Sequence, residues 1–208
     1  MTTDSAIKDA VSRYYSGKLA EHGPTSLGVD WNSKASQELR FAQLLTVCGE
    51  LAGFSINDYG CGYGALYGYL RDRAADFTYT GFDWSEAMVA EAKRLHGSER
   101  DCNFVSGDDA LVPADYTVAS GVFNVKLGAG DADWRRYVIE TLHDFDRLSS
   151  RGFAFNALTV YSDADRMVTR LHYADPLKLF DYCKRNFSPA VALLHDYELY
   201  EFTIVVRK

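Results

Sequence analysis

The chain has 208 residues, of which 47% are hydrophobic and 25% are charged, as in an ordinary globular domain. Its formal net charge of −7 disfavours a nucleic-acid partner, because binding a phosphate backbone needs a basic surface. No apolar run reaches the roughly 18 to 20 residues that a membrane-spanning helix needs. The first residues, MTTDSAIKDAV, are acidic where a signal peptide is basic, so we expect a cytoplasmic protein that binds neither nucleic acid nor membrane.

The cysteines and histidines show no metal-binding pattern. The four cysteines are widely spaced and include no CxxC pair, which fits free thiols in a reducing compartment. The histidines also lack the spacing of metal ligands. We therefore expect no metal site.

The first part of the chain is predicted to be helical. Apolar residues keep helical spacing over residues 7–15, and again over residues 35–48 after Ser33, a residue type that caps helices well. Residues 16–31 lie between these patterns and are rich in Gly, Pro and Ser. That composition predicts an irregular loop.

After residue 53 the sequence alternates between short apolar runs and helical patterns. Such alternation predicts a doubly wound, Rossmann-like α/β sheet that is mostly parallel and has helices on both faces. The last two apolar runs are close enough to form a hairpin, which adds one antiparallel strand. The expected strands are residues 54–58, 77–83, 103–107, 116–122, 152–160, 190–197 and 200–208, and the expected helices are residues 65–75, 85–97, 134–148 and 176–185.

Three glycines, Gly60, Gly62 and Gly64, follow the first predicted strand in the stretch NDYGCGYGALYGYL. A glycine turn between a strand and a helix is where open α/β sheets bind ligands. The GxGxG spacing differs from the dinucleotide pattern GxGxxG, and Asp58 is a poor neighbour for a pyrophosphate but a good one for an ammonium group. The pattern therefore disfavours a nicotinamide-dependent oxidoreductase, while simple tight helix packing remains an alternative role for the glycines.

Together, DYGCGYG, YTGFDWSEAMVAEAK, FVSGDDALVP and YTVASGVF resemble the class I S-adenosylmethionine-dependent methyltransferases. The resemblance covers roughly residues 35 to 208. It includes the terminal hairpin and an acidic residue at the end of the second strand. It implies methyl transfer with S-adenosylmethionine as cofactor. We expect residues 33–208 to form the methyltransferase domain and residues 1–32 to form an N-terminal helix and a candidate lid.

The resemblance also implies a cofactor site at the strand ends. The three glycines let the backbone pass beside the methionine part of the cofactor, and Asp58 lies near its amino group. Asp83 accepts hydrogen bonds from the ribose hydroxyls, although it could instead only flank the following helix. Trp84 and Met88 are expected beside the adenine, although they could instead be ordinary core residues. The other expected cofactor residues are Asp108 or Asp109, at the exocyclic amine of the adenine, and Ser120.

The cofactor residues do not identify the methyl acceptor. The fourth strand is followed by SGVFNV rather than [DNS]PP[YFW], which disfavours amino methylation of DNA bases or glutamine. No Pro-Cys pair accompanies that strand, which disfavours C5 methylation of pyrimidines. We expect transfer to an N or O atom of a small molecule, and the alternative is a non-catalytic cofactor-binding module or partner subunit.

Acceptor residues are expected at the carboxyl ends of the strands, where ligands bind such sheets. The fourth strand brings Asn124 there and the fifth brings Asn156. Trp31 ends the N-terminal loop and is expected to exclude water as part of the lid, with His22 or Tyr161 available as a base. The alternative is that the N-terminal residues simply cap the sheet.

Overall fold

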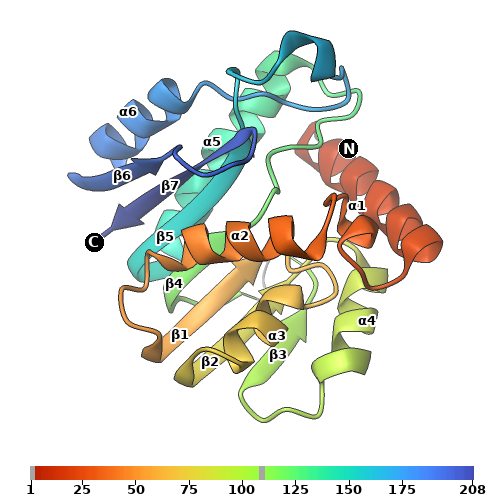
Figure 1. Cartoon of the computed structure of the whole chain (residues 1–208), viewed down its shortest axis with the longest axis vertical. Coiled ribbons are helices and arrows are strands. Elements are labelled where there is room, and N and C mark those ends of the chain that lie inside the picture. Colours follow the sequence, from red (N-terminus) through yellow and green to blue (C-terminus); the bar gives the residue numbers. More distant parts are fainter. Residues whose placement is uncertain (1–2, 108–110) are drawn as a thin grey trace.

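The computed structural model describes residues 3–107 and 111–208, which form one seven-stranded sheet with helices on both faces (Figure 1). The strand order is β3-β2-β1-β4-β5-β7-β6, and β7 alone among these strands runs antiparallel to the others. This confirms the predicted doubly wound, Rossmann-like sheet with its C-terminal hairpin. The strands are β1 (Ala52–Tyr59), β2 (Ala75–Phe82), β3 (Cys102–Val105), β4 (Ala114–Ala119), β5 (Ser149–Leu158), β6 (Ala190–Leu194) and β7 (Glu201–Arg207).

The predicted helices are present, and side chains cap several of them. Ser33 forms a capping box with Ser36 at the start of one helix. Ser85 begins another by accepting a hydrogen bond from the Met88 N–H, and Asp175 caps the last helix just before its first-turn proline. The helices are α1 (Thr3–His22), α2 (Lys34–Leu45), α3 (Ala65–Arg71), α4 (Glu86–His96), α5 (Asp131–Arg147) and α6 (Pro176–Asn186), with short 3₁₀ helices at Leu27–Val29 and Ala164–Arg166.

Several predicted boundaries differ from the structure by a few residues, and two of these differences have a clear local cause. The expected loop begins only after His22, because residues 16–22 continue α1. Gly17 faces open space in that helix, and Gly23, with a φ of 65°, follows the helix in the left-handed conformation. Helix α3 ends at Arg71, so the last part of the predicted helix is instead a turn that leads into β2.

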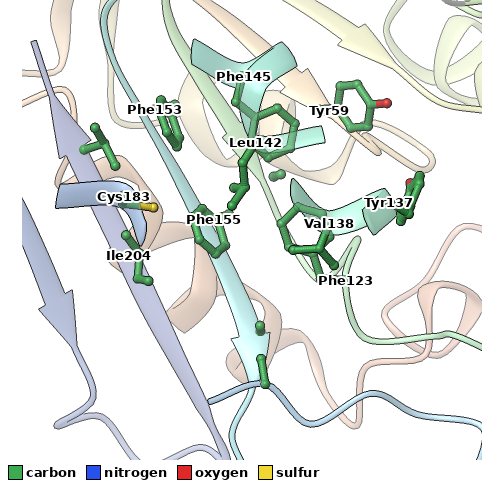
Figure 2. Close-up of a cluster of buried hydrophobic side chains, with 14 of the residues drawn as sticks. Tyr59, Phe123, Tyr137, Val138, Leu142, Phe145, Phe153, Phe155, Cys183 and Ile204 are labelled. Atoms are coloured by element: carbon green, nitrogen blue, oxygen red, sulfur yellow. The ribbon is translucent and has the colours of Figure 1, made fainter. Parts of the chain in front are cut away.

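The sheet separates two hydrophobic cores. One lies against α5 and α6 and is extended by Ile7 of α1; Figure 2 shows part of it, including Phe153, Phe155 and Ile204. The other lies against α2, α3 and α4 and receives Ala154 and Val205. Neighbouring residues of β5 and β7 thus point into opposite cores, as the alternation of a strand requires.

A buried ion pair ties α2 to the last strand of the sheet. Arg40 of α2 is 6% exposed and Glu201 of β7 is 1% exposed. The Arg40 Nε and Nη2 donate to the two oxygens of the Glu201 carboxylate at 2.9 and 2.7 Å. Asn156 of β5 donates to the same carboxylate at 2.5 Å and accepts from the Gly121 N–H at 2.7 Å. This network fixes the turn that follows β4 relative to α2 and β7.

We predict that Arg40→Ala lowers the free energy of unfolding by about 3 to 5 kcal/mol, because it leaves the Glu201 carboxylate buried without its cation. Urea unfolding measures the change. Lys34→Ala is the matched control, since Lys34 is exposed on the same helix and pairs with Glu38 at the surface. The control should change stability by less than about 0.5 kcal/mol. An Arg40→Ala protein as stable as the parent would contradict the importance of this pair.

Candidate functional site

The glycine turn after β1 requires glycine for its backbone and for its packing. Gly60, Gly62 and Gly64 have φ values of 79°, 55° and 82°, all in the left-handed region. A Cβ on Gly60 would overlap the side chain of Val122, and one on Gly64 would lie 2.9 Å from the Phe104 ring. The packing role therefore holds for these two glycines. A Cβ on Gly62 would instead meet a side chain of the N-terminal segment (residues 3–32), 3.0 Å away.

Two acids flank this turn. Asp83 follows β2, and its two carboxylate oxygens accept from the Gly62 N–H and the Ser85 N–H, both at 2.9 Å. Asp58 lies in β1, is 3% exposed and accepts from the Tyr79 hydroxyl at 2.6 Å. Asp83 thus flanks the start of α4, which is the alternative role considered for it in the sequence.

Burial makes both carboxylates costly to ionise. Burial raises the pKa of Asp58 to about 7, and the charge of Asp83 adds to the rise against the opposing hydrogen bond from Tyr79. Burial also raises the pKa of Asp83 to about 6, although the Ser85 and Gly62 N–H groups oppose the rise. A cationic group beside Asp83, which lines the first cavity described below, would offset this cost. Asp58 lines neither that cavity nor the second one.

A first cavity of about 50 Å³ lies between this turn and the N-terminal segment. The Ser120 hydroxyl has no hydrogen-bond partner in the described part of the chain, although its oxygen is buried. Met88 is fully buried at the start of α4. An unsatisfied hydroxyl beside glycine backbone and a carboxylate fits a polar ligand such as S-adenosylmethionine. The lining residues are Gly62, Asp83, Met88, Ser120, Gly121 and Val122, together with Tyr15, Val29 and Trp31.

The residues expected around the adenine are not all placed at this cavity. The Trp84 ring packs edge-on against Phe82, with the Lys8 ammonium 4.2 Å from its centre, and does not line the cavity. Its partial burial against the core fits the alternative role as core. Asp108 and Asp109 lie outside the described residues.

A second, more polar cavity of about 240 Å³ adjoins the first. Tyr15, Val29 and Trp31 line both cavities, so the N-terminal segment forms their common wall. Asn124 lies in the second cavity as expected for an acceptor residue, with its carbonyl oxygen accepting from the Leu158 N–H at 3.0 Å. The other lining residues are Asp30, Asn32, Arg40, Val125, Leu158, Arg170, Leu171 and Glu201.

The structure does not bring together all the predicted acceptor and catalytic residues. Asn156 is fully buried in the network with Glu201 and does not line either cavity. His22 ends α1 beside Glu21, and Tyr161 is 63% exposed beside His195, so neither of these predicted bases lines a cavity. Tyr15 was missed by the sequence reasoning, because its helical spacing resembles that of an ordinary core residue.

Metal-binding clusters and membrane-spanning helices are both absent from the residues that the structure describes. None of these residues form a group of three or more His, Cys, Asp or Glu side chains able to hold a metal ion. No helix in this part of the chain is both long enough and apolar enough to span a bilayer.

The strand order, the glycine turn, the acid near the end of β1 and the acid after β2 define the fold of class I S-adenosylmethionine-dependent methyltransferases. Residues 56–146 match a family described as a methyltransferase domain. The "Putative methyltransferase Rv1506c" of Mycobacterium tuberculosis is 52% identical over 155 residues, which are 74% of this chain and 93% of that protein. The chain therefore belongs to the methyltransferase family.

Solved structures share the fold at low sequence identity. The magnesium protoporphyrin IX methyltransferase of Synechocystis PCC 6803, with S-adenosylmethionine bound, has a TM-score of 0.67 and 13% identity, over 100% of this chain and 98% of that chain. Phosphoethanolamine N-methyltransferase 1 of Haemonchus contortus has a TM-score of 0.68 and 14% identity, over 100% of this chain and 50% of that chain. These likenesses extend over the whole sheet and the N-terminal segment.

We predict that Asp83→Ala weakens S-adenosylmethionine binding at least tenfold. Each charge-assisted hydrogen bond contributes about 1.5 to 3 kcal/mol, and about 1.4 kcal/mol is a factor of ten. Calorimetric titration measures the dissociation constant, with Asp181→Ala on the exposed face of α6 as control. Unchanged affinity in a folded Asp83→Ala protein would refute the assignment.

The raised pKa values also predict how stability depends on pH. The folded values, about 7 for Asp58 and about 6 for Asp83, exceed the ordinary value of 3.8, so the folded state retains protons that the unfolded state releases. The free energy of unfolding without cofactor should therefore fall as the pH rises from about 4 to about 7. Asp58→Asn should flatten this fall and raise stability at pH 8 by at least about 1 kcal/mol.

Asp115 provides the control of opposite sign. The Ser55 N–H holds the pKa of Asp115 below its usual value, so this carboxylate stabilises the fold when it is charged. Asp115→Asn should lower stability at pH 8, where Asp58→Asn raises it. Urea unfolding across the pH range tests both, and equal changes in the two variants would be inconsistent with the prediction.

Proposed function

We propose that this chain transfers a methyl group from S-adenosylmethionine to an N or O atom of a small molecule held in the second cavity. The proposal rests on one observation: Gly62, Asp83 and Ser120, whose hydroxyl has no partner among the described residues, line one cavity that shares a wall with a second, polar one. Membership of the methyltransferase family supports a reaction of this kind.

We propose one orientation for the cofactor at the first cavity, once the N-terminal segment has moved to admit it. Its methionine part passes the bare backbone at Gly62, its ammonium group faces the region of Asp58, and its ribose lies toward Asp83. Met88 contacts the adenine, and Ser120 supplies a hydroxyl to a polar atom. The bound cofactor supplies a methyl group on a positively charged sulfur, so the chain has to align the two reactants and exclude water.

The size of the second cavity supports a small acceptor. Ligand pockets usually measure about 300 to 1,000 Å³, and this cavity of about 240 Å³ lies just below that range. The Haemonchus contortus enzyme of the same fold is crystallised with phosphoethanolamine, a small molecule. A small metabolite is therefore a better fit than a polymer.

The N-terminal segment is proposed to be a lid that closes over the cofactor. The first cavity is far smaller than an ordinary ligand pocket, so the segment has to move before the cofactor can enter. A Cβ on Gly121 would overlap the Trp31 ring, which therefore lies directly on the turn after β4. The guanidinium of Arg40 stacks 3.8 Å from the centre of the same ring. These contacts support a role for the segment beyond capping the sheet.

Two measurements test the proposed function. Titration with S-adenosylmethionine tests binding, and incubation with labelled cofactor and a metabolite extract tests transfer. Binding without any transfer would favour the non-catalytic module, and absence of binding would refute the proposal.

We predict that Trp31→Ala lowers methyl transfer at least about tenfold with a smaller change in cofactor affinity, because water enters and the reactants lose their alignment. Single-turnover assays with bound labelled cofactor measure the rate. Trp31→Phe keeps an aromatic ring against Gly121 and should retain most of the activity. Normal turnover in Trp31→Ala would remove the ring from the site.

A further inference from the structure

We propose that the methyl acceptor is a negatively charged oxygen, of a carboxylate or phosphoryl group, on a small molecule. We propose further that this oxygen is methylated in the second cavity without a general base. The inference rests on the proposed function, and Arg170, Asn124 and Tyr15 are the residues that bind the acceptor. It follows from which polar groups in this cavity already have partners and which do not.

The acidic groups of the cavity are already satisfied. The Glu201 carboxylate accepts two hydrogen bonds from Arg40 and one from Asn156. The Asp30 carboxylate accepts from the Tyr14 hydroxyl at 2.5 Å, and its other oxygen lies 3.0 Å from the Lys18 ammonium. The hydrogen bonds and the charge of both carboxylates are therefore already matched by groups of the protein itself.

Most of the polar groups left over are donors, and the exposed Asn32 amide offers both a donor and an acceptor. In the described part of the chain, neither the Tyr15 hydroxyl nor the Asn124 amide nitrogen has a hydrogen-bond partner. The Arg170 guanidinium is 47% exposed and lies 3.8 Å from Asp30, beyond hydrogen-bond distance. Because Lys18 already neutralises Asp30, Arg170 is available to a ligand. A ligand that satisfies these three groups must present oxygen lone pairs and negative charge.

Among the described residues that line the cavity, no side chain is suited to remove a proton. Burial would raise the pKa of Asp30, but the hydrogen bonds from Tyr14 and Lys18 outweigh it and hold that pKa below its usual range. Burial raises the pKa of the Tyr15 hydroxyl, so it keeps its proton and donates. The two predicted bases, His22 and Tyr161, lie elsewhere. An alcohol acceptor would need a base, whereas a carboxylate or phosphoryl oxygen is already ionised.

The reaction of an oxyanion balances without proton transfer. A lone pair on the acceptor oxygen forms the new O–C bond, and the C–S bond breaks with its electron pair going to sulfur. The negative oxygen and the positive sulfur both become neutral, which yields a methyl ester and a thioether. Tyr15, which lines both cavities, can hold the reacting oxygen at their junction.

An amine acceptor fits this cavity less well. A protonated amine has no lone pair to attack with, and its positive charge would face Arg170. A neutral amine offers one lone pair, which the methyl group takes, and leaves the donors of Tyr15 and Asn124 unsatisfied. Such unsatisfied donors cost about 1 to 3 kcal/mol each when they are buried.

The test incubates the full chain with labelled S-adenosylmethionine and a panel of small carboxylates and phosphoryl compounds. Each of these compounds is compared with the alcohol and the amine of the same carbon skeleton. We expect label only in oxyanion products. Mild alkali releases volatile methanol from carboxylate esters and leaves phosphoryl methyl esters intact for mass spectrometry, which distinguishes the two sources. At saturating S-adenosylmethionine the rate with an oxyanion substrate should be flat from about pH 8 to 9, where Asp58 and Asp83 are already ionised.

Arg170→Gln should raise KM for the oxyanion at least tenfold while kcat and cofactor affinity change little. Arg166→Gln, on the same connection but paired with Asp163 at the surface, is the matched control and should behave as the parent. Transfer confined to alcohols or amines, or an Arg170→Gln protein with unchanged KM, would overturn the inference while the proposed function stands. Failure to bind S-adenosylmethionine or to transfer to any compound would overturn both.

Discussion

The carboxylate of Asp83 is the contact on which the candidate site depends. It accepts from the Gly62 N–H on one oxygen and from the Ser85 N–H on the other, so one side chain joins the turn after β1 to the start of α4. The Ser85 hydroxyl in turn lies 2.8 Å from the Ser16 hydroxyl, which fixes α1 at the same point. Figure 1 shows α1 beside α4, where these contacts lie.

This arrangement carries a cost that a ligand can repay. Burial disfavours the charged form of Asp83 and raises its pKa to about 6. Burial likewise raises the pKa of Asp58 to about 7. A fold selected for stability alone would replace buried acids by neutral residues of similar shape. Their presence at the ligand-binding edge of the sheet supports a role in holding a cation or hydroxyl groups.

The sequence predicts most of the fold because the signals are local. Strand–helix alternation, the glycine turn and the caps Ser33 and Ser85 each depend on residues within a few positions of one another. The second half of α1 was missed for the same reason. Glycine and serine there favour a loop locally, but Ser12 and Ser16 contact the Trp84–Ser85 segment across the fold and favour the helix.

The candidate site was less predictable on its acceptor side. Asn124 follows β4 and lines the cavity, whereas Asn156 lies inside β5, because that strand continues to Leu158. Its side chain therefore meets Glu201 and Gly121 instead of a ligand. Tyr15 reaches both cavities only because α1 crosses the strand ends, and no pattern in its own helix indicates that crossing.

The shared wall couples the two cavities in the proposed enzyme. Tyr15, Val29 and Trp31 line both, and Asp30 between them is held by Lys18 of α1 and approached by Arg170 of the connection after β5. In the proposed lid, one displacement of the N-terminal segment would open both cavities and one closure would complete both. A ligand that binds more tightly to the closed form must then favour binding of the other, and thermodynamic linkage makes the effect equal in both directions. In the proposed enzyme, water exclusion, cofactor retention and acceptor recognition thus depend on the same few side chains.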